Sequence, residues 1–588
     1  MQSQSLALSR TVIGLSQGLG LYLLYLAHET ESWPATDGLL FAALLVPAVY
    51  VPPMLVAALG HFRWPTLATW MIVALAVCAG LGWYDIFRDP SGGPVTTAGV
   101  RILPTPGLWL SLGAALFITH ALVGAGESDR RIVAKYQTYF DASWKLAIQL
   151  VLAGVFVGAM WLLLWLGAEL FRLIRIEFLA ELIKRNWFWI PVTTVAVSYA
   201  LHITDVRAVL VQGVRTLKLT LLSWLLPIMA ALAVAFVLAL PFTGLEVLWS
   251  TRRATTILLF AVGALVFLIN AAYQDGQTEG AMPRLLTYAR VVAAIAIVPL
   301  AALAGYGLFA RVLQYGWTPQ RVVACACVVV ASCYAAGYLL AAVRAPLRMN
   351  GVERTNIAVA CIIVAAVLSL FSPIADPARI SVADQLSRLQ SGAIPPERFD
   401  FGFLRFDSGR YGRAALDRLA GTTDGPQATT IAQRAKETLQ LQGRWQAQAK
   451  PIQTTPQSRL ANITVVHPAG AALPAGFVEQ DWNALPRRWL LPACLTAATA
   501  TRCEAILVDL NDDGKSELLV FGSPTTGSAF AQNDDGTWRL LGTIVNVGCT
   551  GAREALRAGR VDVVSPAYKE IVAGDQRLRI NTECVPAR

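Results

Sequence analysis

The sequence predicts a polytopic α-helical membrane protein with about eleven transmembrane helices, followed by a C-terminal soluble α+β region that ends in a small β-rich domain. Of the 588 residues, 55% are hydrophobic and only 15% are charged, whereas soluble domains carry about 25% charged residues. Apolar stretches long enough to cross a bilayer recur up to about residue 375. Beyond that point charged residues recur every few positions. Two solvents, lipid and water, are therefore expected along one chain.

A helix needs about 20 apolar residues to cross a hydrocarbon core of about 30 Å. Residues 168–189 mix apolar with charged side chains, which is typical of a helix that leaves the bilayer and an amphipathic piece on its surface. We predict spans, of which the first and sixth are short, at residues 11–27, 39–60, 66–87, 107–126, 146–171, 190–206, 219–240, 255–273, 291–312, 322–343 and 357–374. The expected domains are residues 1–375 (transmembrane), 376–456 (helical soluble connector) and 457–588 (small β-rich domain).

Basic residues near span ends are retained on the cytoplasmic side of a membrane. With the N-terminus inside, the cytoplasmic loops hold most of them, and the first opposite loop, residues 28–38, holds none. The bias is incomplete, because arginines such as Arg88, Arg172 and Arg321 fall on the other side. An odd number of spans then places the C-terminal domain outside. We expect a bacterial inner (cytoplasmic) membrane, with the N-terminus cytoplasmic and the C-terminal domain periplasmic.

The cysteines give a second argument for an outside C-terminal domain. The soluble region holds an even number of them, which in an oxidising compartment indicates two disulfides. We prefer the pairs Cys494–Cys503 and Cys549–Cys584 among the three pairings that are possible. Reduced, buried thiols in a cytoplasmic domain are the alternative.

The sharpest motif lies between two apolar runs of the tail, at residues 509–517. Side-chain oxygens at alternate positions, with a glycine that turns the backbone, are what calcium needs to gather six or more oxygen ligands. The spacing resembles the short calcium loops of integrin-type propeller repeats and selects Asp509, Asn511, Asp513 and Glu517. Calcium is therefore the one cofactor we predict, and an acidic turn between strands without metal is the alternative.

Polar groups at membrane depth are costly and count as functional candidates. Tyr199, His202 and Asp205 are spaced at i, i+3 and i+6 in the sixth predicted span and share one helix face. A histidine beside a carboxylate could relay protons. The alternative is that Asp205 marks the cytoplasmic interface while His202 forms a hydrogen bond within the bundle.

Several stretches carry a resemblance to a known family: residues 139–145, 200–206, 270–276, 314–319, 353–356, 376–382 and 404–407. On these stretches the chain resembles a bacterial membrane family catalogued as domain of unknown function 4153. The resemblance implies a multispanning envelope protein with a C-terminal soluble region. It implies no agreed activity, so no catalytic residue is carried over.

Three functions compete. The first is a non-enzymatic envelope anchor, scaffold or sensor whose periplasmic tail binds an ion or a periplasmic or envelope protein partner, because no nucleotide-binding loop, nucleophile elbow or zinc-protease motif occurs. The second is a transporter or lipid-handling protein, suggested by the His202 and Asp205 face and by prolines in the second span. The third is a lipid-linked glycosyltransferase that uses outward carboxylates, for which the candidates are Glu29, Glu31, Asp37, Asp85 and Asp89.

The lipid bilayer is the partner that the composition itself implies. The formal net charge of +10 does not indicate nucleic-acid binding. Lys and Arg mostly flank apolar segments, where topology explains them, and do not gather in a patch with aromatic stacking partners.

Overall fold

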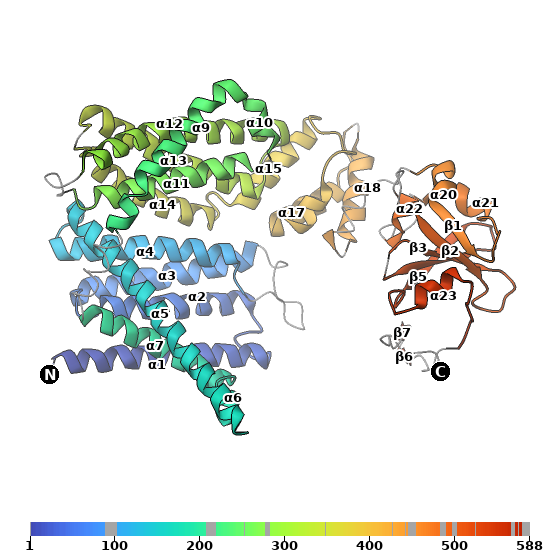
Figure 1. Cartoon of the computed structure of the whole chain (residues 1–588), viewed down its shortest axis with the longest axis horizontal. Helices are drawn as coiled ribbons and strands as arrows, with labels where there is room; N and C mark the ends of the chain where they lie inside the picture. Colours follow the sequence, from blue (N-terminus) through green and yellow to red (C-terminus); the bar gives the residue numbers. More distant parts are fainter. Residues whose placement is uncertain are drawn as a thin grey trace. The chain divides into compact units, whose positions relative to one another are not determined.

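The fold is taken from a computed structural model of the whole chain. Its described residues are 2–88, 103–206, 219–251, 253–276, 283–346, 348–425, 427–441, 443–444, 454–482, 490–496, 502–523, 525–565, 571–573 and 576–578. The chain divides into two compact units, Met1–Lys436 and Glu437–Arg588. The first unit is helical and the second contains the sheets (Figure 1).

Each predicted span falls on a long helix of the first unit. The helices are α1 (Gln2–Glu29), α2 (Gly38–Ala58), α3 (Trp64–Arg88), α4 (Pro106–Asp129), α5 (Tyr136–Leu173), α6 (Phe178–Leu182), α7 (Asn186–Val206), α9 (Leu226–Thr243), α10 (Leu245–Ser250), α11 (Ala254–Tyr273), α12 (Arg284–Tyr315), α13 (Pro319–Arg344) and α14 (Gly351–Leu370). Nine helices among the described residues are long and apolar enough to cross a membrane. The predicted spans at residues 11–27 and 190–206 fall on α1 and α7, which are not among these nine helices. These are the two spans whose apolar stretches are short in the sequence.

The helices α1 and α7, which are less hydrophobic than the other predicted spans, pack closely on each other. Two glycines one turn apart, Gly14 and Gly18, face α7. A Cβ atom on Gly14 would lie 2.5 Å from Oγ of Ser198, and one on Gly18 would collide with the backbone of Pro191. Small residues at this spacing let membrane helices approach until their backbones touch.

The helix α2 continues through Pro47, Pro52 and Pro53. Pro52 and Pro53 have no N–H, so the carbonyl groups four residues earlier, at Ala48 and Val49, lose their helical donors. The side-chain amide of Gln17 in α1 donates to both carbonyls, at 3.0 and 3.1 Å. The second span is therefore not broken, which removes one support of the transporter hypothesis.

We expect Gln17→Leu to lower the free energy of unfolding by about 1–3 kcal/mol for each carbonyl group left without a donor. The measurement is unfolding of the detergent-solubilised chain. In a Pro52→Ala, Pro53→Ala background the backbone supplies the missing donors, so Gln17→Leu should then cost much less. An equal cost in both backgrounds would contradict this role of Gln17.

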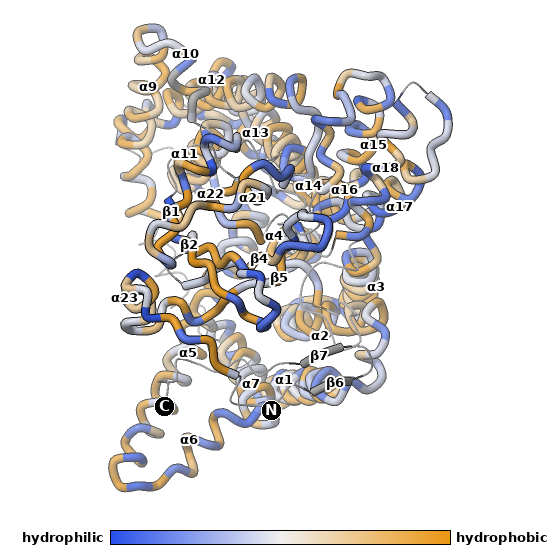
Figure 2. Tube along the Cα trace, turned by 90° about the vertical axis from the view of Figure 1, so that its right-hand side faces the viewer, coloured by the Kyte–Doolittle hydropathy of each residue, from blue (hydrophilic) through white to orange (hydrophobic). Residues whose placement is uncertain are grey.

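The predicted connector begins with three helices that belong to the first unit: α15 (Pro377–Gln390), α16 (Phe401–Phe406) and α17 (Gly409–Ala420). The helix α18 (Ala428–Leu439) contains the boundary between the two units. The helix α15 contacts α13, and α17 contacts α3. Hydrophilic residues dominate α17 and α18, whereas hydrophobic residues dominate α9 and α11 (Figure 2). The aromatic run at residues 399–407 places Phe399, Phe401 and Leu404 in the interior, in agreement with a packed connector.

The second unit is built on a five-stranded sheet in the order β1-β2-β3-β4-β5. Its strands are β1 (Ile463–His467), β2 (Cys503–Val508), β3 (Glu517–Phe521), β4 (Gly527–Gln532) and β5 (Trp538–Ile544). The pair β1 and β2 is parallel and the other pairs are antiparallel. Short helices α20 (Pro456–Asn462), α21 (Ala475–Glu479), α22 (Ala493–Thr496) and α23 (Ala552–Arg557), and the two-stranded sheet of β6 (Ile571–Ala573) and β7 (Gln576–Leu578), complete the described part.

An aromatic cluster forms the core on one face of this sheet. The ring of Phe477 lies 4.7 Å from Trp482, 5.2 Å from Phe530 and 5.4 Å from Trp538, centroid to centroid. Edge-to-face pairs of this kind contribute about 0.5–1.5 kcal/mol each beyond their buried area. A core of this size explains why the second unit is compact by itself.

Runs of β-type composition at residues 462–466, 505–508, 518–521, 538–545 and 561–564 predict five strands, and the first four of these runs are strands. The fifth run, residues 561–564, is irregular and not a strand. The strand β4 was not predicted. The turn at Asp534, Asp535 and Gly536 joins β4 to β5 as a hairpin, with Gly536 at φ 85°.

The predicted disulfide between Cys494 and Cys503 is present, with Cα atoms 6.0 Å apart. Cys549 is also disulfide-bonded, and its predicted partner, Cys584, lies outside the described residues. Both Cys494 and Cys503 are buried beside the aromatic cluster. The bond therefore ties α22 to β2 inside the core.

We expect the double variant Cys494→Ala, Cys503→Ala to lose about 2–3 kcal/mol of stability in the second unit, because a bond across a short loop restricts the unfolded chain. Denaturant unfolding of the full chain, with and without reductant, measures the loss. The matched control is Cys361→Ala, an exposed free thiol, which should leave the midpoint unchanged. Equal midpoints for both variants would contradict the expectation.

Candidate functional site

A cluster of charged side chains surrounds Asp205 at the end of α7. Arg10 comes from α1, His61 from the loop between α2 and α3, and Lys145 from α5. Asp205 lies 2.8 Å from Nη2 of Arg10, 2.8 Å from Nε2 of His61 and 2.8 Å from Nζ of Lys145. One carboxylate thus holds together four parts of the chain.

Burial makes this cluster energetically important. The Arg10 side chain is 1% exposed and that of Asp205 is 11% exposed. Arg10 also donates to the carbonyl of Leu59 at 2.7 Å, at the end of α2. A buried charge that loses its partner costs several kcal/mol, so Arg10 and Asp205 each require the other.

The structure brings two of the three predicted intramembrane residues together. Nη1 of Arg10 donates to Nδ1 of His202 at 3.3 Å, so Arg10 bridges His202 and Asp205. Tyr199 is 48% exposed and lies at a shallow apolar pocket with Leu15 and Pro191. Tyr199 is therefore not part of the cluster.

Sequence reasoning missed the cationic partners of Asp205. Arg10, His61 and Lys145 lie 195, 144 and 60 positions away in the chain, and each also fits the ordinary role of a basic residue at a span end. The one available signal was Arg10, which is the only Lys, Arg, Asp or Glu of the first helix before its last residue, Glu29. Such a charge needs a counterion in the membrane.

A cavity of about 360 Å³ adjoins the cluster. His61, Lys145 and Gln149 line it and also contact Asp205. The remaining lining residues come from α2, α4, α5 and the loop after α2: Ala57, Phe62, His120, Ala121, Gly124, Ser128, Thr138, Asp141, Ala142 and Leu146. The cavity therefore runs from the ends of α4 and α5 inward and combines charged, polar and apolar walls.

His120 is one of the residues that line this cavity. Nε1 of Trp70 donates to Nδ1 of His120 at 3.1 Å, so a neutral ring carries its proton on Nε2. The residue is only 7% exposed. Its exposed part contributes to the cavity wall.

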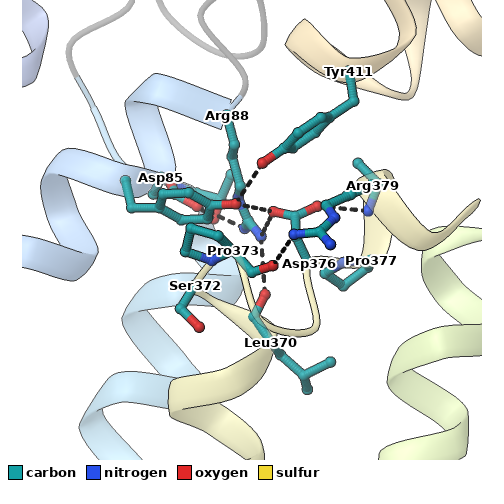
Figure 3. A network of polar contacts seen from close by, with 12 residues as sticks. Asp85, Arg88, Leu370, Ser372, Pro373, Asp376, Pro377, Arg379 and Tyr411 are labelled. Carbon is teal, nitrogen blue, oxygen red and sulfur yellow. Dashed lines mark hydrogen bonds and ion pairs between the residues drawn. The ribbon is translucent and has the colours of Figure 1, made fainter. Parts of the chain in front are cut away.

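A second network lies at the other end of α3, where the connector begins (Figure 3). Asp376 is fully buried and accepts hydrogen bonds from Oη of Tyr84 at 3.1 Å and from the backbone of Ala378 and Arg379 at 2.8 and 3.0 Å. Nη1 of Arg88 forms an ion pair with Asp376 at 3.5 Å. Asp376 is thus both the N-cap of α15 and the ionic partner of α3.

The same network reaches α17 and α4. Oη of Tyr84 is 2.9 Å from Oη of Tyr411 in α17. The buried carboxylate of Asp85 accepts from Nη2 of Arg88 at 2.7 Å and from the backbone of Thr105 at 2.6 Å. These contacts fix α15 and α17 onto the membrane helices.

Two of the outward carboxylates considered for a glycosyltransferase, Asp37 and Asp85, have structural roles, and Asp89 lies outside the described residues. Asp37 accepts from the backbone of Leu39 and Leu40 as the N-cap of α2. Asp85 is held by Arg88 and Thr105.

The predicted calcium loop is a tight turn between β2 and β3. Asp509 accepts from the backbone of Asn511 and Gly514, at 3.2 and 2.8 Å. The side chain of Asn511 donates to Asp513 at 2.9 Å, and the buried carboxylate of Glu517 accepts from the backbone of Leu510 at 2.7 Å. Three of the predicted residues lie in this turn and Glu517 is the first residue of β3. The side-chain oxygens of all four accept hydrogen bonds within this segment.

The hydrogen bonds of this loop lower the pKa of Asp513, chiefly through the backbone N–H of Lys515 and then through the amide of Asn511. Within the described ranges no group of three or more His, Cys, Asp or Glu side chains is arranged to hold a metal ion. Calcium binding at Asp509, Asn511, Asp513 and Glu517 stays a prediction.

No protein-family profile, no curated protein and no solved structure matches this chain. The resemblance to the family of unknown function 4153 is thus a prediction that these comparisons leave untested. The two ionic networks and the cavity are therefore the observations on which a function must be built.

Proposed function

We propose that the chain is a bacterial inner-membrane protein that anchors a periplasmic domain and acts there as a scaffold or sensor, without catalysing a reaction. The observation that carries this proposal is the buried network of Asp376. An ion pair and hydrogen bonds hold the first connector helix on α3, and a buried carboxylate of this kind is costly to expose or to leave unpaired. A connector fixed in this way suits a membrane anchor, because the chain then leaves the membrane helices at a defined point.

Charge placement supports the orientation. In the first unit the N-terminus lies at one end of the helices, and α15 and α17 lie at the other (Figure 1). The end with the N-terminus carries Arg63 and Lys145 in the predicted cytoplasmic loops and helix ends. Two arginines at the other end have local partners: Arg88 binds Asp85, and Arg321 donates to the carbonyl of Gly316. The uneven distribution of Lys and Arg between the two ends, although incomplete, therefore fits a cytoplasmic N-terminus.

Cysteine labelling in intact cells tests this topology. The free cysteines Cys78, Cys325, Cys327, Cys333 and Cys361 are first replaced by alanine. A membrane-impermeant maleimide, applied after permeabilising the outer membrane, should then label Lys515→Cys. It should label Arg131→Cys only after lysis of the inner membrane. The reverse pattern would overturn the proposed orientation.

The tail is proposed to bind an envelope component or calcium. A photoreactive residue at Leu541, which is exposed on β5, should give a discrete cross-link to another envelope component in intact cells, whereas the same residue at the buried Leu518 should not. For calcium, millimolar Ca²⁺ should raise the unfolding midpoint of the full chain, and Asp509→Asn with Asp513→Asn should remove the increase. The absence of both effects would leave the tail without the proposed binding role.

A second candidate is a transporter or lipid-handling protein. The observation that favours it is the cavity beside the Asp205 cluster, because ionisable side chains next to a membrane cavity are typical of substrate paths. Flux into proteoliposomes should then fall for Lys145→Gln. Unchanged flux would count against this candidate and leave the anchor proposal intact.

A further inference from the structure

We propose that the apolar groove beside Tyr199 binds an isoprenoid quinone, a ring with carbonyl oxygens on a long hydrocarbon chain. The groove lies between α1, α5 and α7 and shares no lining residue with the cavity beside Asp205. The inference rests on the hydroxyl group of Tyr199, on its depth in the membrane and on the walls of the groove. It goes beyond the anchor function and does not depend on the transporter candidate.

The hydroxyl group of Tyr199 has no hydrogen-bond partner within the part of the chain that the structure describes. Other hydroxyl groups of α7 find partners locally, because Thr193, Thr194 and Thr204 each donate to a backbone carbonyl one turn earlier in the helix. A tyrosine hydroxyl stands at the far end of its ring and cannot reach those carbonyls. An unpaired hydroxyl group is costly in hydrocarbon, so this one needs an acceptor from another molecule.

Tyr199 lies too deep in the membrane for that acceptor to belong to a phospholipid. It stands six positions before Asp205 and thirteen after Asn186, the first residue of α7, which are about 9 and 20 Å along a helix. Its side chain leans toward the middle of the bilayer, because Cα–Cβ bonds tilt toward the N-terminus of a helix. The other groove residues of α7 agree with this direction, since they lie between Pro191 and Ala196. Phospholipids carry their oxygens at the surfaces of the bilayer, and their acyl chains offer no acceptor.

The walls of the groove suit a ring and a hydrocarbon chain. The volume is about 330 Å³, within the range of about 300–1,000 Å³ found for small-molecule sites. The rings of Phe156 and Tyr199 are 41% and 48% exposed and offer surfaces on which a quinone ring can stack. Met160 adds a thioether, which packs favourably on aromatic rings. Leu15 and Val195 supply apolar surface for the chain of the ligand.

These features together select the class of ligand. The described residues that line the groove carry no charge, so the ligand is neutral. It must dissolve in the hydrocarbon core and must carry an acceptor that stays there. An isoprenoid quinone meets all three conditions, because its carbonyl oxygen accepts from the hydroxyl group of Tyr199 while its chain remains among lipid tails.

Native mass spectrometry of the full chain in detergent tests the proposal with two probes, a ubiquinone that carries a two-unit isoprenoid chain and the same chain without the ring. The wild type should bind the quinone more tightly than the chain alone. Tyr199→Phe should weaken quinone binding about tenfold, as expected for the loss of one hydrogen bond, and should leave binding of the chain alone unchanged. Tyr288→Phe, at an exposed tyrosine of α12, is the matched control and should bind the quinone like the wild type.

A second pair of variants tests the groove itself. Met160→Trp narrows the groove and should weaken the binding of both probes, whereas Leu162→Trp, at an exposed position of the same helix, should not. Equal quinone binding by the wild type and Tyr199→Phe would overturn the proposal, as would equal binding of the two probes by the wild type. A cross-link from a photoreactive residue at Val195 to another protein in intact cells would assign the groove to a partner helix and also overturn it. None of these results bears on the labelling test of the anchor function.

Discussion

Replacing Asp376 by alanine should release the connector from the membrane helices. The change leaves Arg88 without one of its two carboxylate partners and leaves Tyr84 and the first turn of α15 without their acceptor. Breaking a buried ionic network in this way costs about 3–5 kcal/mol. We expect limited proteolysis of the detergent-solubilised chain to cut between residues 371 and 420 at a rate at least tenfold higher than in the wild type.

The matched control for this experiment is Asp417→Ala. Asp417 is an exposed carboxylate of α17, so its removal should leave the cutting rate within about twofold of the wild type, as is usual for surface substitutions. If Asp376→Ala were as resistant to the protease as Asp417→Ala, the network would not be what fixes the connector.

The second large effect is expected at the opposite end of the bundle. Asp205→Ala leaves the buried guanidinium of Arg10 without a counterion and should destabilise the packing of α1, α5 and α7 by about 3–5 kcal/mol. Unfolding of the detergent-solubilised chain measures this loss. The double variant Arg10→Met, Asp205→Leu should recover most of it, because two apolar residues of similar volume need no partner.

Recovery of stability in the double variant would show that the loss in Asp205→Ala comes from the broken ion pair. If any substitution in α7 lowered the stability, the double variant would not recover. Glu246→Ala, an exposed carboxylate of α10, is the control and should unfold like the wild type. A double variant as unstable as Asp205→Ala alone would show that the cost arises from the shape of the site and not from the unpaired charge.

The membrane helices could be predicted because their signal is local. A run of about 20 apolar residues is typical of a transmembrane helix and of few other structures, and each predicted span falls on a helix. The two that lie outside the nine apolar helices, α1 and α7, carry Arg10, His202 and Asp205. Their hydropathy is lowered by these side chains, whose partners lie on other helices and cannot be found from a window of sequence.

The errors in the second unit have a similar cause. Residues 561–564 have strand-like composition but no neighbour to pair with among the described strands, whereas the small residues of β4 form a strand because β3 and β5 flank it. Strand propensity measures fit to a pleated neighbour more than a preference of the backbone. The disulfide between Cys494 and Cys503 was predictable because short spacing limits the choice.

The contact between Gln17 and the proline-containing helix α2 has a consequence for biosynthesis. The ribosome delivers α1 to the membrane before α2, so the amide of Gln17 is already present when the carbonyls of Ala48 and Val49 arrive. If the gene were rearranged so that residues 2–29 followed the other helices, α2 would enter the membrane before Gln17 was present. The two carbonyl groups would then lack hydrogen-bond donors in lipid, at a cost of several kcal/mol for each group. The order of helices in the gene is thus part of how this protein is assembled.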